Sequence, residues 1–179
     1  EGRTYSKSLT HSAGASWSRT LEVGNLSISL DGSDTRSFRG DPRGMQFVNF
    51  QSTFDGPLSR YSQLTGSLTM QGSRSLVASG EQPGFDVTTG GNIGYSNRRF
   101  FNVRDLRFQS TLAANTQQYA DRFKGTIGAL PQNTASSWDN RLDYRIGLLS
   151  FVLNGRVTRT DGRYSESVFF SVSRPFGDI

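Results

Sequence analysis

The clearest pattern in the chain is the alternation of apolar and polar residues over positions 138–173. Three alternating runs are separated by two tight turns, Gly147-Leu148 and Asp161-Gly162. A period of two residues predicts β-strands with two chemically different faces. Asp-Gly favours a type I′ hairpin turn and a leading Gly favours type II′, so both turns predict two-residue loops.

These turns predict a register that the alternation can test. Tyr144 faces Phe151 across the first turn, and Leu142 faces Leu153, which faces Phe170 across the second. A slip of one residue would turn every side chain of a strand to the other face. Because the apolar residues meet one another in this register, we predict a three-stranded sheet with one apolar face.

Similar alternating segments begin at residues 24, 64, 106 and 149, about 40 residues apart. Partner strands are expected at 8–20, 45–54 and 85–101, with turns at 21–24, 55–57 and 102–105. Gly90-Gly91 predicts a bulge or kink within its strand. Longer polar segments at 36–44, 74–84 and 119–137 join the hairpins at the other end. We therefore predict an all-β, antiparallel, up-and-down fold of four hairpins and eight strands.

The end of the chain suggests what lies against the apolar face. The run 149–160 exceeds the 9–11 residues that cross a bilayer. Val168, Phe170 and Val172 alternate towards the near-terminal aromatic Phe176. This pattern resembles the C-terminal signature strand of bacterial outer-membrane β-barrel proteins. The segments 144–147 (YRIG) and 174–177 (RPFG) are similar to C-terminal hairpins of Gram-negative barrels tied to exopolysaccharide export or to porin–cytochrome conduits.

The resemblance implies a transmembrane β-barrel in the bacterial outer membrane. Residues 1–179 would form one domain, either a complete eight-stranded barrel or the C-terminal part of a larger one. The expected function is a porin-like pore or conduit, or a transport-associated channel component. Two alternatives stay open: a non-porous membrane anchor whose loops bind ligands, and a soluble β-sandwich or adhesin domain whose apolar face is a protein core.

Composition narrows the chemistry. The chain has no cysteine, so thiolate metal sites and disulfides are excluded. No run of 18 apolar residues exists, which argues against helical membrane spans. The net charge of +5 comes mostly from arginines that are dispersed along the chain. Nucleic-acid binding is therefore not expected, since such proteins usually concentrate basic residues in a patch.

Catalytic and cofactor signatures are weak. His11 is the single histidine, and we expect a solvated or interfacial role for it rather than a catalytic one. The Gly-rich segment 90–94 lacks the Lys-Ser/Thr of a phosphate loop. Asp31, Asp34 and Asp41 lie loosely together without a calcium-binding pattern. We predict no enzyme activity, no cofactor and no metal.

Two residue sets follow from the barrel interpretation. Arg141, Asp143, Arg145 and Arg156 are predicted to face the lumen, where they would either fill a small barrel with charge pairs or line a pore that favours anions. The predicted lipid-facing or girdle residues are Trp17, Tyr144, Phe151, Phe170 and Phe176. The same aromatic residues would be core in a sandwich. The expected partners are outer-membrane lipid and a protein partner in or on the barrel.

Overall fold

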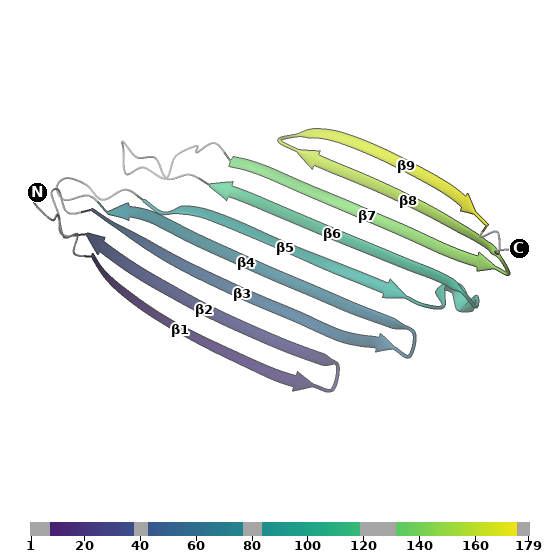
Figure 1. The fold of residues 1–179 in the computed structure, drawn as a ribbon, viewed down its shortest axis with the longest axis horizontal. Helices are drawn as coiled ribbons and strands as arrows, with labels where there is room; N and C mark the ends of the chain where they lie inside the picture. Colours follow the sequence, from purple (N-terminus) through teal and green to yellow (C-terminus); the bar gives the residue numbers. More distant parts are fainter. Residues whose placement is uncertain (1–7, 38–42, 77–83, 119–131, 175–179) are drawn as a thin grey trace, which may run out of the picture.

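The computed structural model describes residues 8–37, 43–76, 84–118 and 132–174. These residues form a single antiparallel sheet of nine strands in sequential order, with one short 3-10 turn (Figure 1). The elements are β1 (Ser8–Leu21), β2 (Gly24–Ser37), β3 (Arg43–Ser59), β4 (Ser62–Leu76), β5 (Asp86–Asn97), η1 (Phe100–Asn102), β6 (Leu106–Gln118), β7 (Gln132–Ile146), β8 (Leu149–Thr160) and β9 (Arg163–Ser173).

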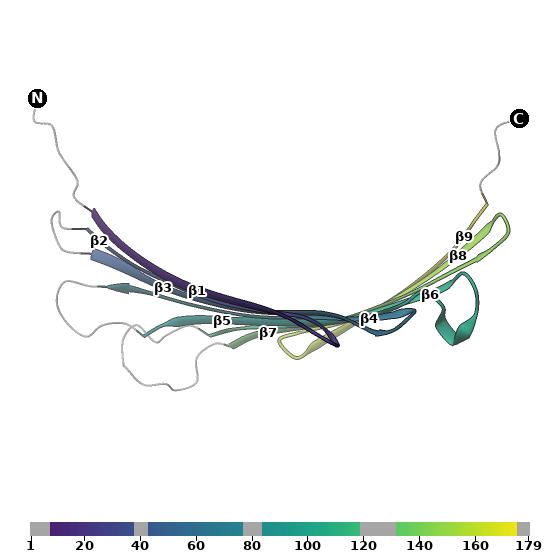
Figure 2. The ribbon, with the colours of Figure 1, turned by 90° about the horizontal axis from the view of Figure 1, so that it is seen from below.

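The antiparallel up-and-down architecture is confirmed, but the predicted count of eight strands is wrong. The tail has the three strands predicted for it, and with the six strands before them the described total is nine. β1 and β9 form the two edges of the sheet and do not pair with each other, so the sheet is open (Figure 1). The two edge strands run in the same direction. Figure 2 shows that this sheet is bowed and twisted, as the handedness of L-residues requires of β-strands.

The predicted register of the tail is confirmed. Tyr144 pairs with Phe151 and Leu142 with Leu153, and Leu153 pairs with Phe170. The backbone explains why. Asp161 and Gly162 both have positive φ, 48° and 83°, as a type I′ turn requires, and Gly147 has φ 56° at the first position of the other turn.

Several predicted turns are corrected. The β1–β2 loop has two residues, 22–23, and not four, although Trp17 does face Ile28 as expected. Residues 55–57 are not a turn: β3 continues to Ser59, and the turn is at 60–61. Glycine is needed at position 56 because β3 passes close to the start of β2 there. A Cβ on Gly56 would meet the Val23 carbonyl oxygen and, at 2.9 Å, the Cα of Gly24.

Gly90 and Gly91 do not form the predicted bulge, since β5 pairs in continuous register with β4 and β6. Their small size is used for close approach: a Cβ on Gly91 would lie 2.9 Å from the Ser67 carbonyl oxygen. The register shift lies instead in β3, between Pro57 and Ser59. Pro57 explains why the register shifts at this point, because proline has no backbone N–H to donate to the neighbouring strand.

The register gives the whole sheet two chemically distinct faces. The apolar face carries large aliphatic and aromatic side chains from all nine strands: Trp17, Ile28, Leu30, Val48, Phe50, Leu68, Met70, Ile93, Leu112, Leu142, Leu153 and Phe170. The polar face carries their neighbours in sequence. No hydrophobic side chain is buried among the described residues. The sheet therefore has no core of its own.

The strands are staggered in a regular way. Consecutive pairings place Thr20, one residue before the end of β1, level with Asp139, seven residues before the end of β7. The turn end of the sheet is thus displaced by six residues over six strand steps. At about 3.4 Å per residue and about 4.8 Å between strands, a line through these turns makes roughly 35° with the perpendicular to the strands.

Candidate functional site

The polar face is richest in charge on β6, β7 and β8. Arg141, Asp143 and Arg145 alternate along β7, and Arg156 projects from β8 on the same face, so the four predicted lumen residues share one surface. Arg141 donates two hydrogen bonds to Asp143, both 2.8 Å long. Arg156 forms an ion pair with Asp139 from the neighbouring strand.

Two further arginines of β6 and β7 on this face are not neutralised by carboxylates. Arg145 donates from Nε to the Gly147 carbonyl oxygen at 3.3 Å. Arg107 on β6 lies opposite Asp143 in the register, yet it makes no ion pair with any described residue. Sequence reasoning missed Arg107, because no turn signal set the register between β6 and β7. We call Arg107, Arg141, Arg145 and Arg156 the arginine patch.

Shallow depressions lie over the arginine patch. One of about 400 Å³ is lined by Gln109, Arg141, Asn154, Arg156 and Phe169 among others. A second of about 330 Å³ is lined by Arg107, Asp143, Arg145 and Ser150, and again by Arg141. Guanidinium groups present planar, forked donors that match carboxylate and phosphate oxygens. The patch can therefore hold small anions.

On β1, β2 and β4 the polar face is lined mainly by short hydroxyl side chains, whereas β3 places larger side chains there, among them Met45, Phe47 and Gln51. The hydroxyl residues of these strands include Thr10, Ser12, Ser16, Ser18, Ser27, Ser29, Ser33, Thr35, Thr65, Ser67, Thr69 and Ser73. Some pair across strands, as Ser27 Oγ does with Thr53 Oγ1 at 2.6 Å. Such side chains can bond to water, but they project little from the sheet.

The predicted girdle residues lie together on the apolar face as far as they are described. Trp17, Tyr144, Phe151 and Phe170 all share it, and the rings of Tyr144 and Phe151 stack with centroids 6.4 Å apart. Phe176 lies outside the described residues. A hollow of about 540 Å³ also opens on this face, where the small residues Gly66, Gly91 and Ala114 lie beside the larger Leu68 and Ile93.

His11 belongs to a polar row that crosses four strands at the edge of the apolar face. It lies opposite Asp34, which lies opposite Gln46, which lies opposite Arg74. Gln46 donates to Asp34 at 3.1 Å, and Arg74 donates to Gln46 at 2.7 Å. No hydrogen bond joins His11 to Asp34.

The suggested aspartate cluster does not come together. Asp31 lies on the polar face and Asp34 on the apolar face of β2, and Asp41 lies outside the described residues. Among residues 8–37, 43–76, 84–118 and 132–174, no three His, Cys, Asp or Glu side chains are grouped so that they could hold a metal ion.

Comparison with known proteins leaves the chain without a named relative. No protein-family model matches it, and neither a curated protein nor a solved structure is detectably similar to it. Within the described ranges, no helix is long and apolar enough to cross a membrane. The two faces of the sheet are therefore the features from which a function can be inferred.

Proposed function

We propose that this chain forms the wall of a bacterial outer-membrane β-barrel with a water-filled lumen, acting as a pore or conduit. One observation carries the proposal: the apolar face extends over nine strands, and no second layer of described residues covers it. Leu30 is 51% exposed, Ile93 59% and Leu112 52%. Monomeric soluble proteins rarely expose contiguous apolar surface beyond a few hundred Å². Lipid is the cover that a barrel wall requires.

Strand geometry supports a membrane. If the turns of the sheet lie at one bilayer surface, the stagger corresponds to a strand tilt of about 35°, near the 35–45° of β-barrels. At that tilt the 13 residues of β6 rise about 36 Å, and the 11 residues of β9 about 31 Å. Both exceed the roughly 30 Å hydrocarbon core of a bilayer.

Over β1, β2 and β4 the polar face favours a wet lumen over a filled one. A small closed barrel needs inward side chains large enough to occupy its interior. The Ser and Thr residues of β1, β2 and β4 are too short for this, whereas they suit a surface that contacts water. A solute or an enclosed protein partner would fit this lining better than a self-filled interior.

The arginine patch predicts the sign of the preferred ion. Its four guanidinium groups face two carboxylates, Asp139 and Asp143, on the same strands. Fixed positive charge in a lumen raises the local concentration of anions and lowers that of cations. We therefore expect a pore that favours anions.

The proposal is tested in two steps. The protein, refolded in detergent, should migrate differently on a gel with and without boiling, and it should then conduct ions in planar bilayers with a reversal potential that favours anions. A protein that stays soluble without detergent and shows no heat-dependent migration would instead be a soluble β domain. A heat-modifiable protein without conductance would be an anchor.

A double variant and a single control variant test the arginine patch. Arg107→Gln with Arg145→Gln removes the two charges of the arginine patch that no carboxylate neutralises, and should reduce the preference for anions. Arg19→Gln removes one charge from the apolar face of β1 and should leave it unchanged. Equal selectivity in all three proteins would show that the patch does not face the conducting path.

A further inference from the structure

The connection between β5 and β6 differs from the other turns at its end of the sheet. The loops at 22–23, 60–61 and 147–148 have two residues each, whereas residues 98–105 separate β5 from β6 and include η1 (Figure 1). A hairpin needs no such length. We call residues 98–105 the β5–β6 knob.

The backbone of the knob is held in an uncommon shape. Phe101, Asn102 and Asp105 have positive φ of 52°, 59° and 62°. This region is disfavoured for a bulky residue such as phenylalanine. Hydrogen bonds close this turn: Asn102 N donates to the Arg99 carbonyl oxygen at 2.9 Å, and Val103 N donates to the Phe100 carbonyl oxygen at 3.0 Å. Arg98 N joins the knob to the neighbouring turn by donating to the Tyr61 carbonyl oxygen at 2.9 Å. Strain that the surroundings maintain is often associated with function.

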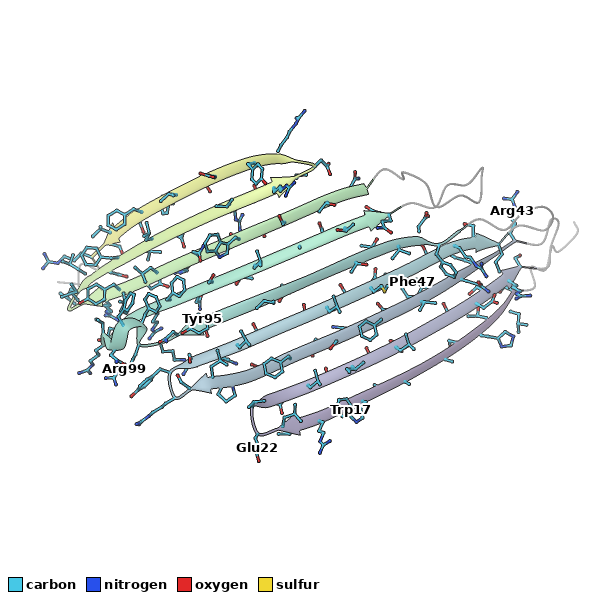
Figure 3. All side chains as sticks on the ribbon, turned by 180° about the vertical axis from the view of Figure 1, so that it is seen from behind. Trp17, Glu22, Arg43, Phe47, Tyr95 and Arg99 are labelled. Atoms are coloured by element: carbon cyan, nitrogen blue, oxygen red, sulfur yellow. The ribbon has the colours of Figure 1, made fainter. Side chains whose placement is uncertain are left out.

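The two phenylalanines of the knob have different surroundings. Phe100 stacks on Phe108 of the apolar face with centroids 4.6 Å apart, and Phe108 lies 6.3 Å from Tyr95. The knob therefore continues the apolar face at its margin. Phe101, by contrast, is 80% exposed, more than any other large hydrophobic side chain in the described residues. Figure 3 shows Tyr95 and Arg99 at this end of the sheet, with Arg43 and Phe47 at the other.

Four arginines lie in the knob or in the turn beside it. Arg98, Arg99 and Arg104 belong to the knob, and Arg60 lies in the adjacent β3–β4 turn. Arg99 donates to the Tyr61 hydroxyl at 2.8 Å and stacks over its ring at 4.8 Å, and Arg60 lies over the same ring at 5.6 Å. The only acidic residue of the knob is Asp105, 3.7 Å from Arg104.

We propose that the β5–β6 knob binds anionic phospholipid, with arginines on the phosphate and Phe101 inserted at the headgroup–acyl boundary. This inference rests on the proposed function, because it places the apolar face in lipid. The cluster sits where that face ends, and aromatic rings favour such interfaces. The cluster has four guanidinium groups and one carboxylate, so its net positive charge complements a surface of phosphate groups. Arg99 and Arg60 contact Tyr61 and not a carboxylate, so their charges can interact with phosphate.

The test starts from the full chain refolded in uncharged detergent and inserted into phosphatidylcholine vesicles, where heat-dependent migration reports folding. Short-chain phosphatidylglycerol or phosphatidylcholine is then titrated into the detergent-solubilised protein, and native mass spectrometry counts the bound lipid. Phosphatidylglycerol should bind more tightly, and its binding should weaken as salt rises.

Three variants separate lipid binding from a structural role. Arg98→Gln with Arg104→Gln should weaken phosphatidylglycerol binding about 25-fold, at about fivefold per arginine. The control, Arg43→Gln with Arg163→Gln, removes the same charge at the opposite end and should have no effect. Phe101→Asn should also weaken binding without loss of folding, because asparagine tolerates positive φ.

The outcomes are distinct. Folding in phosphatidylcholine with equal binding of both lipids, or with equal effects of the two double variants, overturns the lipid inference and leaves the knob as a protein contact. Failure of the wild-type chain to enter any bilayer overturns the proposed function, and the lipid inference with it.

Discussion

Placing one arginine on β6 at three positions tests which face of the sheet meets lipid. Leu112 is the middle residue of the 13-residue strand, lies on the apolar face and is 52% exposed. Its neighbour Thr111 lies on the polar face, opposite Asp139. Leu106 lies on the apolar face at the turn end of the same strand. The three substitutions differ in face or in depth, and not in strand.

The expected magnitudes follow from depth in the bilayer. Leu112→Arg places a charge near the bilayer centre and should cost about 2–4 kcal/mol, a roughly 30- to 700-fold loss in the folded-to-unfolded ratio. Leu106→Arg, close to the interface, should cost about 0–1 kcal/mol. Thr111→Arg should be nearly neutral, because a guanidinium there meets water and faces the Asp139 carboxylate.

The assay is reversible urea unfolding in lipid vesicles, followed by circular dichroism, with the heat-modifiable band on gels as a second readout. Equal costs for Leu112→Arg and Thr111→Arg would refute the assignment of faces. A cost for Leu106→Arg as large as that for Leu112→Arg would contradict lipid as the cover, since a protein core imposes no dependence on bilayer depth.

Three turn variants test the backbone argument. Gly162→Ala, at φ 83°, should cost about 1–2 kcal/mol of unfolding free energy, and an unchanged urea midpoint would contradict the type I′ turn. Asp161→Ala should cost about 1 kcal/mol, since Asp161 Oδ1 accepts from Thr134 N at 3.1 Å; if it does not, this contact is not stabilising. Gly24→Ala, at φ 143° and with its Cβ 2.5 Å from Gly56 Cα, should cost about 1–3 kcal/mol. A normal yield of folded protein would disprove that close approach.

Sequence patterns predicted the C-terminal register because local and long-range signals agree there. Asp161-Gly162 and Gly147 specify turns with positive φ, and those turns place apolar residues opposite one another. The same argument placed Trp17 opposite Ile28, although Glu22-Val23 carries no turn signal and the loop length was therefore wrong.

Other features had no local signal. Asp55-Gly56-Pro57 has turn composition, but Gly56 serves the close approach to Gly24, which only the pairing of β2 with β3 reveals. Phe101 and Asn102 adopt positive φ in a turn that the bonds from Asn102 N to the Arg99 carbonyl oxygen and from Val103 N to the Phe100 carbonyl oxygen close, and the residue type of Phe101 gives no sign of it. Arg107 joined the arginine patch only once its partner strand was known.

The most direct test of the membrane assignment uses the absence of cysteine from the chain, which makes every introduced cysteine a unique label. Single cysteines at residues 151–154 of β8 are labelled with a fluorophore in lipid vesicles. Phe151→Cys and Leu153→Cys should be quenched by a lipid-borne quencher, and Val152→Cys and Asn154→Cys by a water-soluble one. The result at residue 152 is the most informative, because Val152 is apolar yet lies on the polar face opposite Ser171. Quenching without alternation, or lipid quenching at residue 152, would contradict the account.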